Sequence, residues 1–268
     1  MPYASEASRN FIMWKYANPT FFLPLVATLL PWLIGATVAA FAIGLWGAFF
    51  SAPADYQQGE TVRIMYIHVP AAWLSMFCYA TMAASALGTL VWRHPLADAA
   101  QKAAAPIGAA FTFICLVTGS LWGKPMWGTW WVWDARLTSV LVLFVIYLGL
   151  IALWQTIEDA SRAARGAAIL TLVGVVNLPI IKFSVDWWNT LHQPASVFRM
   201  SGPTIAPSML WPLLVMGIAF TLLFTTLHLM ATRNEILRRR ARRLAIQAAS
   251  GETDAQPTHR LTMTGGAP

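Results

Sequence analysis

The stretch WGKPMWGTWWVWDAR, residues 122–136, separates two long apolar runs in a chain of 268 residues. It holds five of the fourteen tryptophans, together with two glycines, one proline and a single acid. Glycine and proline are poor helix formers, so we expect this stretch to be non-helical. An indole offers a flat apolar face and one N–H donor, which suits a half-exposed platform for a flat partner. The competing interpretation is an aromatic belt at a membrane interface, where tryptophan is enriched.

The overall composition indicates a membrane protein. Hydrophobic residues make up 57% of the chain and charged residues only 11%, whereas soluble domains carry about 25% charged residues. The two cysteines, Cys78 and Cys115, lie in apolar segments without a CxxC pattern, so we expect small buried side chains without a disulfide or metal. The chain also lacks a CxxCH motif, which excludes a c-type cytochrome.

The apolar runs predict an all-α integral membrane protein with six transmembrane helices, since each run approaches the ~20 residues that a spanning helix needs. The expected spans are 24–49, 68–91, 103–121, 137–157, 167–185 and 208–231. The first span has no cleavage signal and is expected to be an uncleaved anchor. We therefore divide the chain into an interfacial segment (1–20), a membrane domain (21–232) and a basic extension with a disordered tail (233–268).

The distribution of basic residues predicts the orientation. An even number of spans puts both termini on one side, and arginine and lysine concentrate in the terminal segments and in the loops near 92–102 and 158–166. By the positive-inside rule both termini are cytoplasmic, so the tryptophan-rich stretch faces outward. The run RNEILRRRARRLAIQ, residues 233–247, is expected to anchor this topology and attract anionic lipid. A nucleic-acid partner is not expected.

Two histidines flank the tryptophan-rich stretch. His68 opens the second span in RIMYIHVPAAW, and His192 lies in the outward loop sequence WWNTLHQPAS. Each alone is most simply a polar residue at a helix end. Together, at one interface, they fit two imidazoles on opposite faces of an iron macrocycle, covered by the indoles. The indoles are Trp122, Trp127, Trp130, Trp131 and Trp133.

Charged residues near this interface have two interpretations each. Arg63 and Arg136 either snorkel at membrane ends or pair with the carboxylates of a haem. Asp134 could orient an indole N–H, pair with Arg136, or cap the helix that begins near Leu137. The sequence leaves these alternatives open.

The stretch WGTWWVWDAR, residues 127–136, resembles the tryptophan-rich signature of the haem-handling proteins of cytochrome c biogenesis. Six spans in a short chain, with single outward histidines before and after the motif, resemble the haem exporter protein C family (CcmC). The segment YIHVPAAW, residues 66–73, and the His192 loop extend this resemblance. The basic tail after Arg233 lies outside the pattern.

The resemblance implies a multi-pass protein of the bacterial inner membrane that holds haem b transiently at the outer face. It implies delivery of haem to the haem chaperone CcmE, beside the small subunit CcmD and the ABC-type subunits CcmA and CcmB. By position, His68 and His192 would be the axial iron ligands. The platform would be Trp122, Trp127, Trp130, Trp131, Trp133 and Asp134, and Arg63 and Arg136 would contact the propionates.

The interpretation we favour is a haem-binding delivery protein rather than a catalyst. One alternative is a haem lyase that promotes covalent attachment to the chaperone. Another is a transmembrane haem transporter subunit. The chain lacks a G-x-x-x-x-G-K-[ST] phosphate loop and its spans carry few charges, which argues against transport by this chain alone. A third is a structural membrane subunit whose tryptophans only anchor it.

Overall fold

The computed structural model describes residues 18–94, 96–192 and 196–254, and these residues form an all-helical protein without strands. Six segments are long and apolar enough to cross a membrane, which confirms the predicted fold class. The helices are α2 (Pro19–Trp46), α3 (Met65–Val91), α4 (Ala97–Trp127), α5 (Ala135–Thr156), α6 (Ala160–Gly174), α7 (Asn177–Trp187) and α8 (Pro207–Asp254). A π-helical turn (Gly47–Ser51) ends the first span, and a 3-10 turn (Glu60–Ile64) precedes α3.

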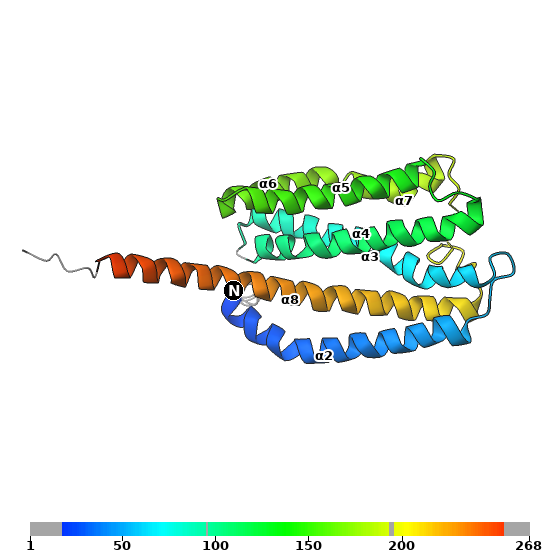
Figure 1. The fold of residues 1–268 in the computed structure, drawn as a ribbon, viewed down its shortest axis with the longest axis horizontal. Helices are drawn as coiled ribbons and strands as arrows, with labels where there is room; N and C mark the ends of the chain where they lie inside the picture. Colours follow the sequence, from blue (N-terminus) through cyan, green and yellow to red (C-terminus); the bar gives the residue numbers. More distant parts are fainter. Residues whose placement is uncertain (1–17, 95, 193–195, 255–268) are drawn as a thin grey trace, which may run out of the picture.

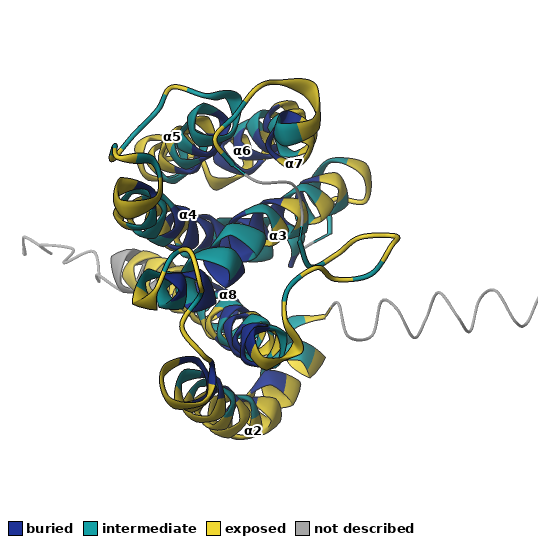
Figure 2. Ribbon diagram, turned by 90° about the vertical axis from the view of Figure 1, so that its right-hand side faces the viewer, coloured by how far each residue is buried: buried dark blue, intermediate teal, exposed yellow. Residues whose placement is uncertain are grey.

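The helices lie in three layers (Figure 1). α3 and α4 form the middle layer and pack closely against each other. α5, α6 and α7 cover one side of this layer, while α8 and then α2 cover the other. Figure 2 shows buried residues concentrated around α3, α4 and the inner side of α8, whereas α2 is largely exposed. Exposed apolar residues on the outermost helices suit contact with lipid.

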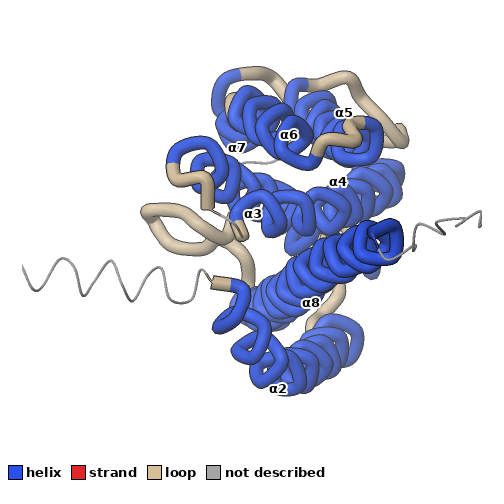
Figure 3. The backbone as a smooth tube through the Cα atoms, turned by 90° about the vertical axis from the view of Figure 1, so that its left-hand side faces the viewer, coloured by secondary structure: helices blue, strands red, loops and turns tan. Residues whose placement is uncertain are grey.

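The two ends of the bundle differ. The end that faces the viewer in Figure 2 carries three connections: from the first span to α3, from α4 to α5, and from α7 to α8. The connection from α4 to α5 contains most of the tryptophan-rich stretch. The opposite end carries the start of α2 and the extension of α8 beyond the bundle (Figure 3). We call these the tryptophan end and the basic end. Their assignment to the outer and cytoplasmic membrane faces remains the prediction made from charge.

Local chemistry explains where several helices begin. The Asn18 side chain caps α2 by accepting a hydrogen bond from the Thr20 amide at 2.9 Å, and Pro19 follows at the first helical position. α2 then runs through Pro24 and Pro31 without a break, so it begins five residues before the predicted span. Of the predicted interfacial segment 1–20, residues 1–17 lie outside the described residues, and Pro19 and Thr20 already belong to α2.

The tryptophan-rich stretch is not wholly non-helical, so that expectation was wrong for its first part. α4 continues through Pro125 to Trp127 and ends where Gly128 adopts a left-handed conformation, φ 74°. Gly123 permits this because the Trp127 ring packs against it: a Cβ on Gly123 would lie 2.9 Å from that ring. A glycine that looked like a helix breaker therefore makes room for an indole.

The fifth span is also broken, where a single helix was expected. α6 ends at Gly174 and α7 starts at Asn177, with Pro179 in its first turn. The buried Tyr79 hydroxyl donates to the Thr171 carbonyl at 3.0 Å, and it leaves no room for a Cβ on Gly174. α7 ends at Trp187 and leads into the loop that carries His192.

α8 confirms that residues 233–247 continue the sixth span as a helix. The helix extends to Asp254. The rest of the predicted tail, 255–268, lies outside the described residues. Cys78 and Cys115 are buried and unbonded, as predicted.

Candidate functional site

His68 lies in the first turn of α3 at the tryptophan end and is held by α4. Its Nδ1 lies 3.1 Å from the Cys115 carbonyl oxygen and 3.1 Å from the Thr118 hydroxyl. Gly119 allows this approach, since a Cβ there would lie 3.0 Å from the imidazole. Among the described residues no group hydrogen-bonds to Nε2. The His68 imidazole is thus held through Nδ1, which leaves Nε2 available to bind a ligand.

His192 is held in a similar way by the start of α5. Its Nδ1 lies 3.6 Å from Asp134 Oδ2 and 3.5 Å from the Thr190 hydroxyl. Thr190 in turn donates a hydrogen bond to Asp134. No described residue hydrogen-bonds to Nε2 of His192. A carboxylate behind an imidazole is the usual arrangement that orients histidine ligands of metals.

Asp134 both caps α5 and lies behind the His192 imidazole. Its Oδ1 accepts a hydrogen bond from the Leu137 amide at 2.8 Å and caps α5, which selects the capping alternative. Burial opposes ionisation of Asp134, but hydrogen bonds from Thr190 and Leu137 bring its pKa below the ordinary value. Burial lowers the pKa of His192, and Asp134 partly opposes this shift. At neutral pH the pair is therefore a carboxylate facing a neutral imidazole, the form that binds metals.

The two histidines share one electrostatic environment. A charge on His192 would act on His68, and the guanidinium of Arg136 acts on both imidazoles. Among the described residues no three His, Cys, Asp or Glu side chains gather into a metal site. Two imidazoles are a ligand set that suits an iron held in a macrocycle.

The five tryptophans divide into two groups. Trp122 and Trp127 buttress the histidines: the Trp122 and His68 rings lie 5.7 Å apart, and the Trp127 and His192 rings lie 4.9 Å apart. Trp122 is fixed by donating to the Gln58 side chain at 2.9 Å. These two indoles are partly buried, and their edge-on contacts limit rotation of the imidazoles.

The other three lie in the loop. Trp130 and Trp133 are 54% and 75% exposed, which leaves their faces open to a partner or a membrane interface. Trp131 packs edge-on against Trp133 at 5.5 Å, and its buried Nε1 has no acceptor among the described residues. An unpaired buried donor at this place fits a ligand that brings acceptor atoms, such as a haem carboxylate.

Both arginines lie at the tryptophan end but contact the protein itself. Arg136 donates to the Ser184 hydroxyl at 3.1 Å and to two carbonyl oxygens of α7, at Ile181 and Lys182. Arg63 pairs with Glu60 and donates to the Ala48 carbonyl. Each guanidinium therefore ties two elements together, a role that the sequence did not reveal.

Sequence reasoning missed the residues that position the histidines. Three of them lie on other elements than the residue they hold: the Cys115 carbonyl and Thr118 on α4, and Gln58 64 residues from Trp122. Thr190 lies in the same loop as His192 and contacts Asp134 across the chain. Threonine and glutamine at these places carried no signal that distinguished them from other polar residues. Only the separation of two residues between Thr190 and His192 hinted at a local contact.

Comparison with known proteins identifies the family. Residues 12–247 match the family model described as heme exporter protein C. The chain belongs to the heme exporter protein C family. It is 70% identical over 234 residues to the heme exporter protein C of Bradyrhizobium diazoefficiens, covering 87% of this chain and 89% of that protein.

Two further relatives are less similar to this chain. The Escherichia coli K12 protein is 54% identical over 236 residues, covering 86% of this chain and 95% of the relative. A Marchantia polymorpha protein named putative cytochrome c biosynthesis ccmC-like mitochondrial protein is 47% identical over 220 residues, 82% of this chain and 93% of its own length. Bacterial relatives and six apolar spans make the chain a multi-pass protein of the bacterial inner membrane.

Substitutions at Asp134 can distinguish its role as the cap of α5 from its role behind His192. Asparagine caps helices as well as aspartate does, so Asp134→Asn is expected to leave thermal stability nearly unchanged. Loss of the charge behind His192 is expected to weaken haem binding by about 10- to 100-fold, the usual effect of losing such a partner. Asp134→Ala should add about 1 kcal/mol of destabilisation because the cap is also lost. Haem titration followed by absorbance, with thermal unfolding in parallel, measures both effects; unchanged haem affinity in Asp134→Asn would contradict the positioning role.

Proposed function

We propose that this protein binds haem at the outer face of the inner membrane and delivers it to the haem chaperone CcmE during c-type cytochrome maturation. The family name supports haem handling, and the name of the Marchantia relative supports a role in cytochrome c biosynthesis. The observation that carries the proposal is the pair of imidazoles at the tryptophan end. Each is held through Nδ1 and presents Nε2.

In this proposal haem is the cargo, and His68 and His192 are its axial ligands. Trp122 and Trp127 hold the two imidazoles, and Trp130, Trp131 and Trp133 cover the macrocycle. Arg136, which acts electrostatically on both histidines, and Arg63 provide positive charge for the propionates. Exposure of Trp130 and Trp133 supports transient binding, because an open shelf lets the acceptor reach the edge of the macrocycle.

The proposed partners follow from the same function. CcmE is the acceptor, and CcmD, CcmA and CcmB are the subunits that work beside the protein. Delivery, rather than catalysis by this chain, is supported by the arrangement of groups at the site. Its polar side chains hold the histidines or connect helices, which suits a binding site.

A transfer assay tests the proposal. Purified protein loaded with haem is mixed with haem-free CcmE in detergent, with and without CcmA, CcmB and CcmD, and the haem on each protein is quantified after separation. We expect haem to leave this protein and reach CcmE, at least tenfold faster than from free haemin at the same concentration. Equal rates from free haemin would contradict delivery. Covalent attachment to CcmE without the other subunits would indicate a lyase instead.

A further inference from the structure

A cavity of about 650 Å³ lies at the basic end, away from the histidine pair, between α4, α5 and α8. Its deeper part is lined by small or apolar side chains: Ala103, Ala105, Pro106, Ile151 and Ala231. Residues nearer the helix ends are polar, among them Lys102, Trp154 and Arg238. The cavity therefore has an apolar interior and a polar, basic mouth.

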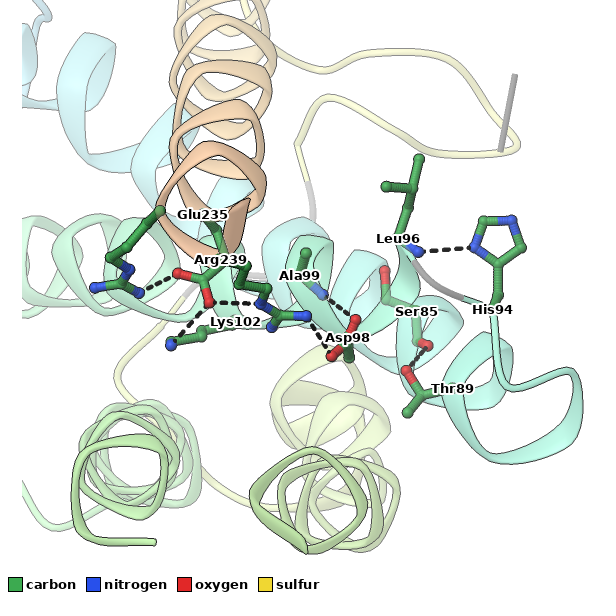
Figure 4. A network of polar contacts seen from close by, with 10 residues as sticks. Ser85, Thr89, His94, Leu96, Asp98, Ala99, Lys102, Glu235 and Arg239 are labelled. Carbon is green, nitrogen blue, oxygen red and sulfur yellow. Dashed lines mark hydrogen bonds and ion pairs between the residues drawn. The ribbon is translucent and has the colours of Figure 1, made fainter. Parts of the chain in front are cut away.

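The mouth carries a connected set of charges, which Figure 4 shows. Glu235 is almost fully buried and accepts from Lys102 at 3.0 Å and from Arg239 at 2.9 Å, and it also pairs with Arg238. Arg239 donates a second bond to Asp98 at 2.7 Å. Three basic side chains thus meet two acidic ones, so the network retains positive charge. The Arg238 side chain is 66% exposed, which leaves it able to contact a further anion.

Trp154 adds a donor that the described residues do not satisfy. The ammonium of Lys102 lies 5.3 Å from the centre of the Trp154 ring, so the two side chains form one surface of the mouth. The Nε1 atom of Trp154 is buried and has no acceptor among the described residues. Buried donors normally have a partner, so a bound molecule with acceptor oxygens at the mouth would complete this site.

We propose that this cavity binds one anionic phospholipid, with its phosphodiester at Lys102, Arg238 and the Trp154 N–H. One acyl chain lies along the apolar interior past Pro106 and Ile151. The position supports this occupant, because the lining residues lie toward the basic-end termini of three candidate spans. Basic pockets between spanning helices bind acidic headgroups. No histidine, cysteine or methionine lines the cavity in the described part of the chain, which argues against an iron macrocycle there.

The test uses the full chain, purified in a detergent that permits native mass spectrometry, titrated with phosphatidylglycerol or phosphatidylcholine. We expect one phosphatidylglycerol to bind at least tenfold more tightly than phosphatidylcholine. Lys102→Gln/Arg238→Gln should weaken phosphatidylglycerol binding by about tenfold or more, since each basic contact contributes about fivefold. The matched control is Arg242→Gln/Arg243→Gln, which removes the same charge from exposed positions farther along α8 and should change binding by less than about twofold.

A second variant covers the case in which the double substitution disturbs the charge network. Trp154→Phe retains an aromatic ring and every ion pair but removes the N–H donor, so it should weaken phosphatidylglycerol binding by about threefold or more. Equal binding of the two lipids, or equal loss in the Arg242/Arg243 control, would overturn the proposal. Displacement of the lipid by inorganic phosphate would assign the mouth to a soluble anion, and displacement by haemin from a His68→Ala/His192→Ala chain would assign it to a tetrapyrrole; either result overturns the lipid site.

Discussion

Replacing Gly108 by alanine is expected to destabilise the protein by about 2 to 6 kcal/mol. A Cβ at this position would lie 2.2 Å from Cζ of Tyr147, far inside van der Waals contact. Tyr147 is fully buried and cannot move away freely, because its hydroxyl donates to the Ser75 carbonyl at 2.8 Å. The cost combines overpacking with loss of a buried hydrogen bond, about 1 to 3 kcal/mol each.

Thermal unfolding of the purified protein in detergent measures this effect. Gly149→Ala is the matched control. Gly149 lies in α5, the helix that carries Tyr147, but an added Cβ there would have nothing within 4 Å. It should be neutral or stabilising by up to about 1 kcal/mol through helix propensity. A Gly108→Ala protein as stable as the Gly149→Ala protein would show that α4 and α5 do not pack as described.

Replacing His68 and His192 together by alanine is expected to abolish haem binding and maturation of c-type cytochromes. The two imidazoles are the only described histidines at the tryptophan end, and the nearby side chains position them rather than replace them. Haem content of the purified variant, compared with the parent, should fall to below about a tenth. Cytochrome c content of cells that carry only the variant should fall in parallel.

His94→Gln provides the control for this experiment. His94 lies in the connection between α3 and α4 at the basic end and receives a hydrogen bond from the Leu96 amide. Its replacement should leave haem content and cytochrome maturation within about twofold of the parent. Normal maturation in the His68→Ala/His192→Ala cells would contradict the haem role and favour a structural subunit.

The sequence predicted the spans well because a membrane imposes long apolar runs on it. It predicted the break between α6 and α7 and the helical start of the tryptophan-rich stretch poorly. Both depend on contacts between helices: Tyr79 against Gly174 and Trp127 against Gly123. Glycine has a low intrinsic helix propensity, so its presence in a sequence argues against a helix. In a packed bundle, however, the missing Cβ lets a neighbouring ring approach the helix.

The sequence singled out the histidine pair as candidate ligands because both residues flank an unusual tryptophan-rich stretch. The residues that orient them were not, since Thr118 and Asp134 act across elements whose rotation and axial shift are set by packing. The capping role of Asp134 could be predicted from the residues that follow it. Its contact with His192, 58 positions later in the chain, could not, because that contact depends on how the loop packs. For the arginines, the sequence showed the charge of each side chain but not its contacts. Arg136 contacts α7, and Arg63 contacts the end of the first span.

We propose that His68 and His192 bind one iron, and spectroscopy measures this directly. Electron paramagnetic resonance and absorption spectra of haem-loaded parent, His68→Ala and His192→Ala proteins answer this. We expect a low-spin, six-coordinate iron in the parent and a high-spin signal in each single variant, because either substitution removes one axial ligand. A low-spin spectrum that is unchanged in either variant would contradict ligation of one iron by both histidines.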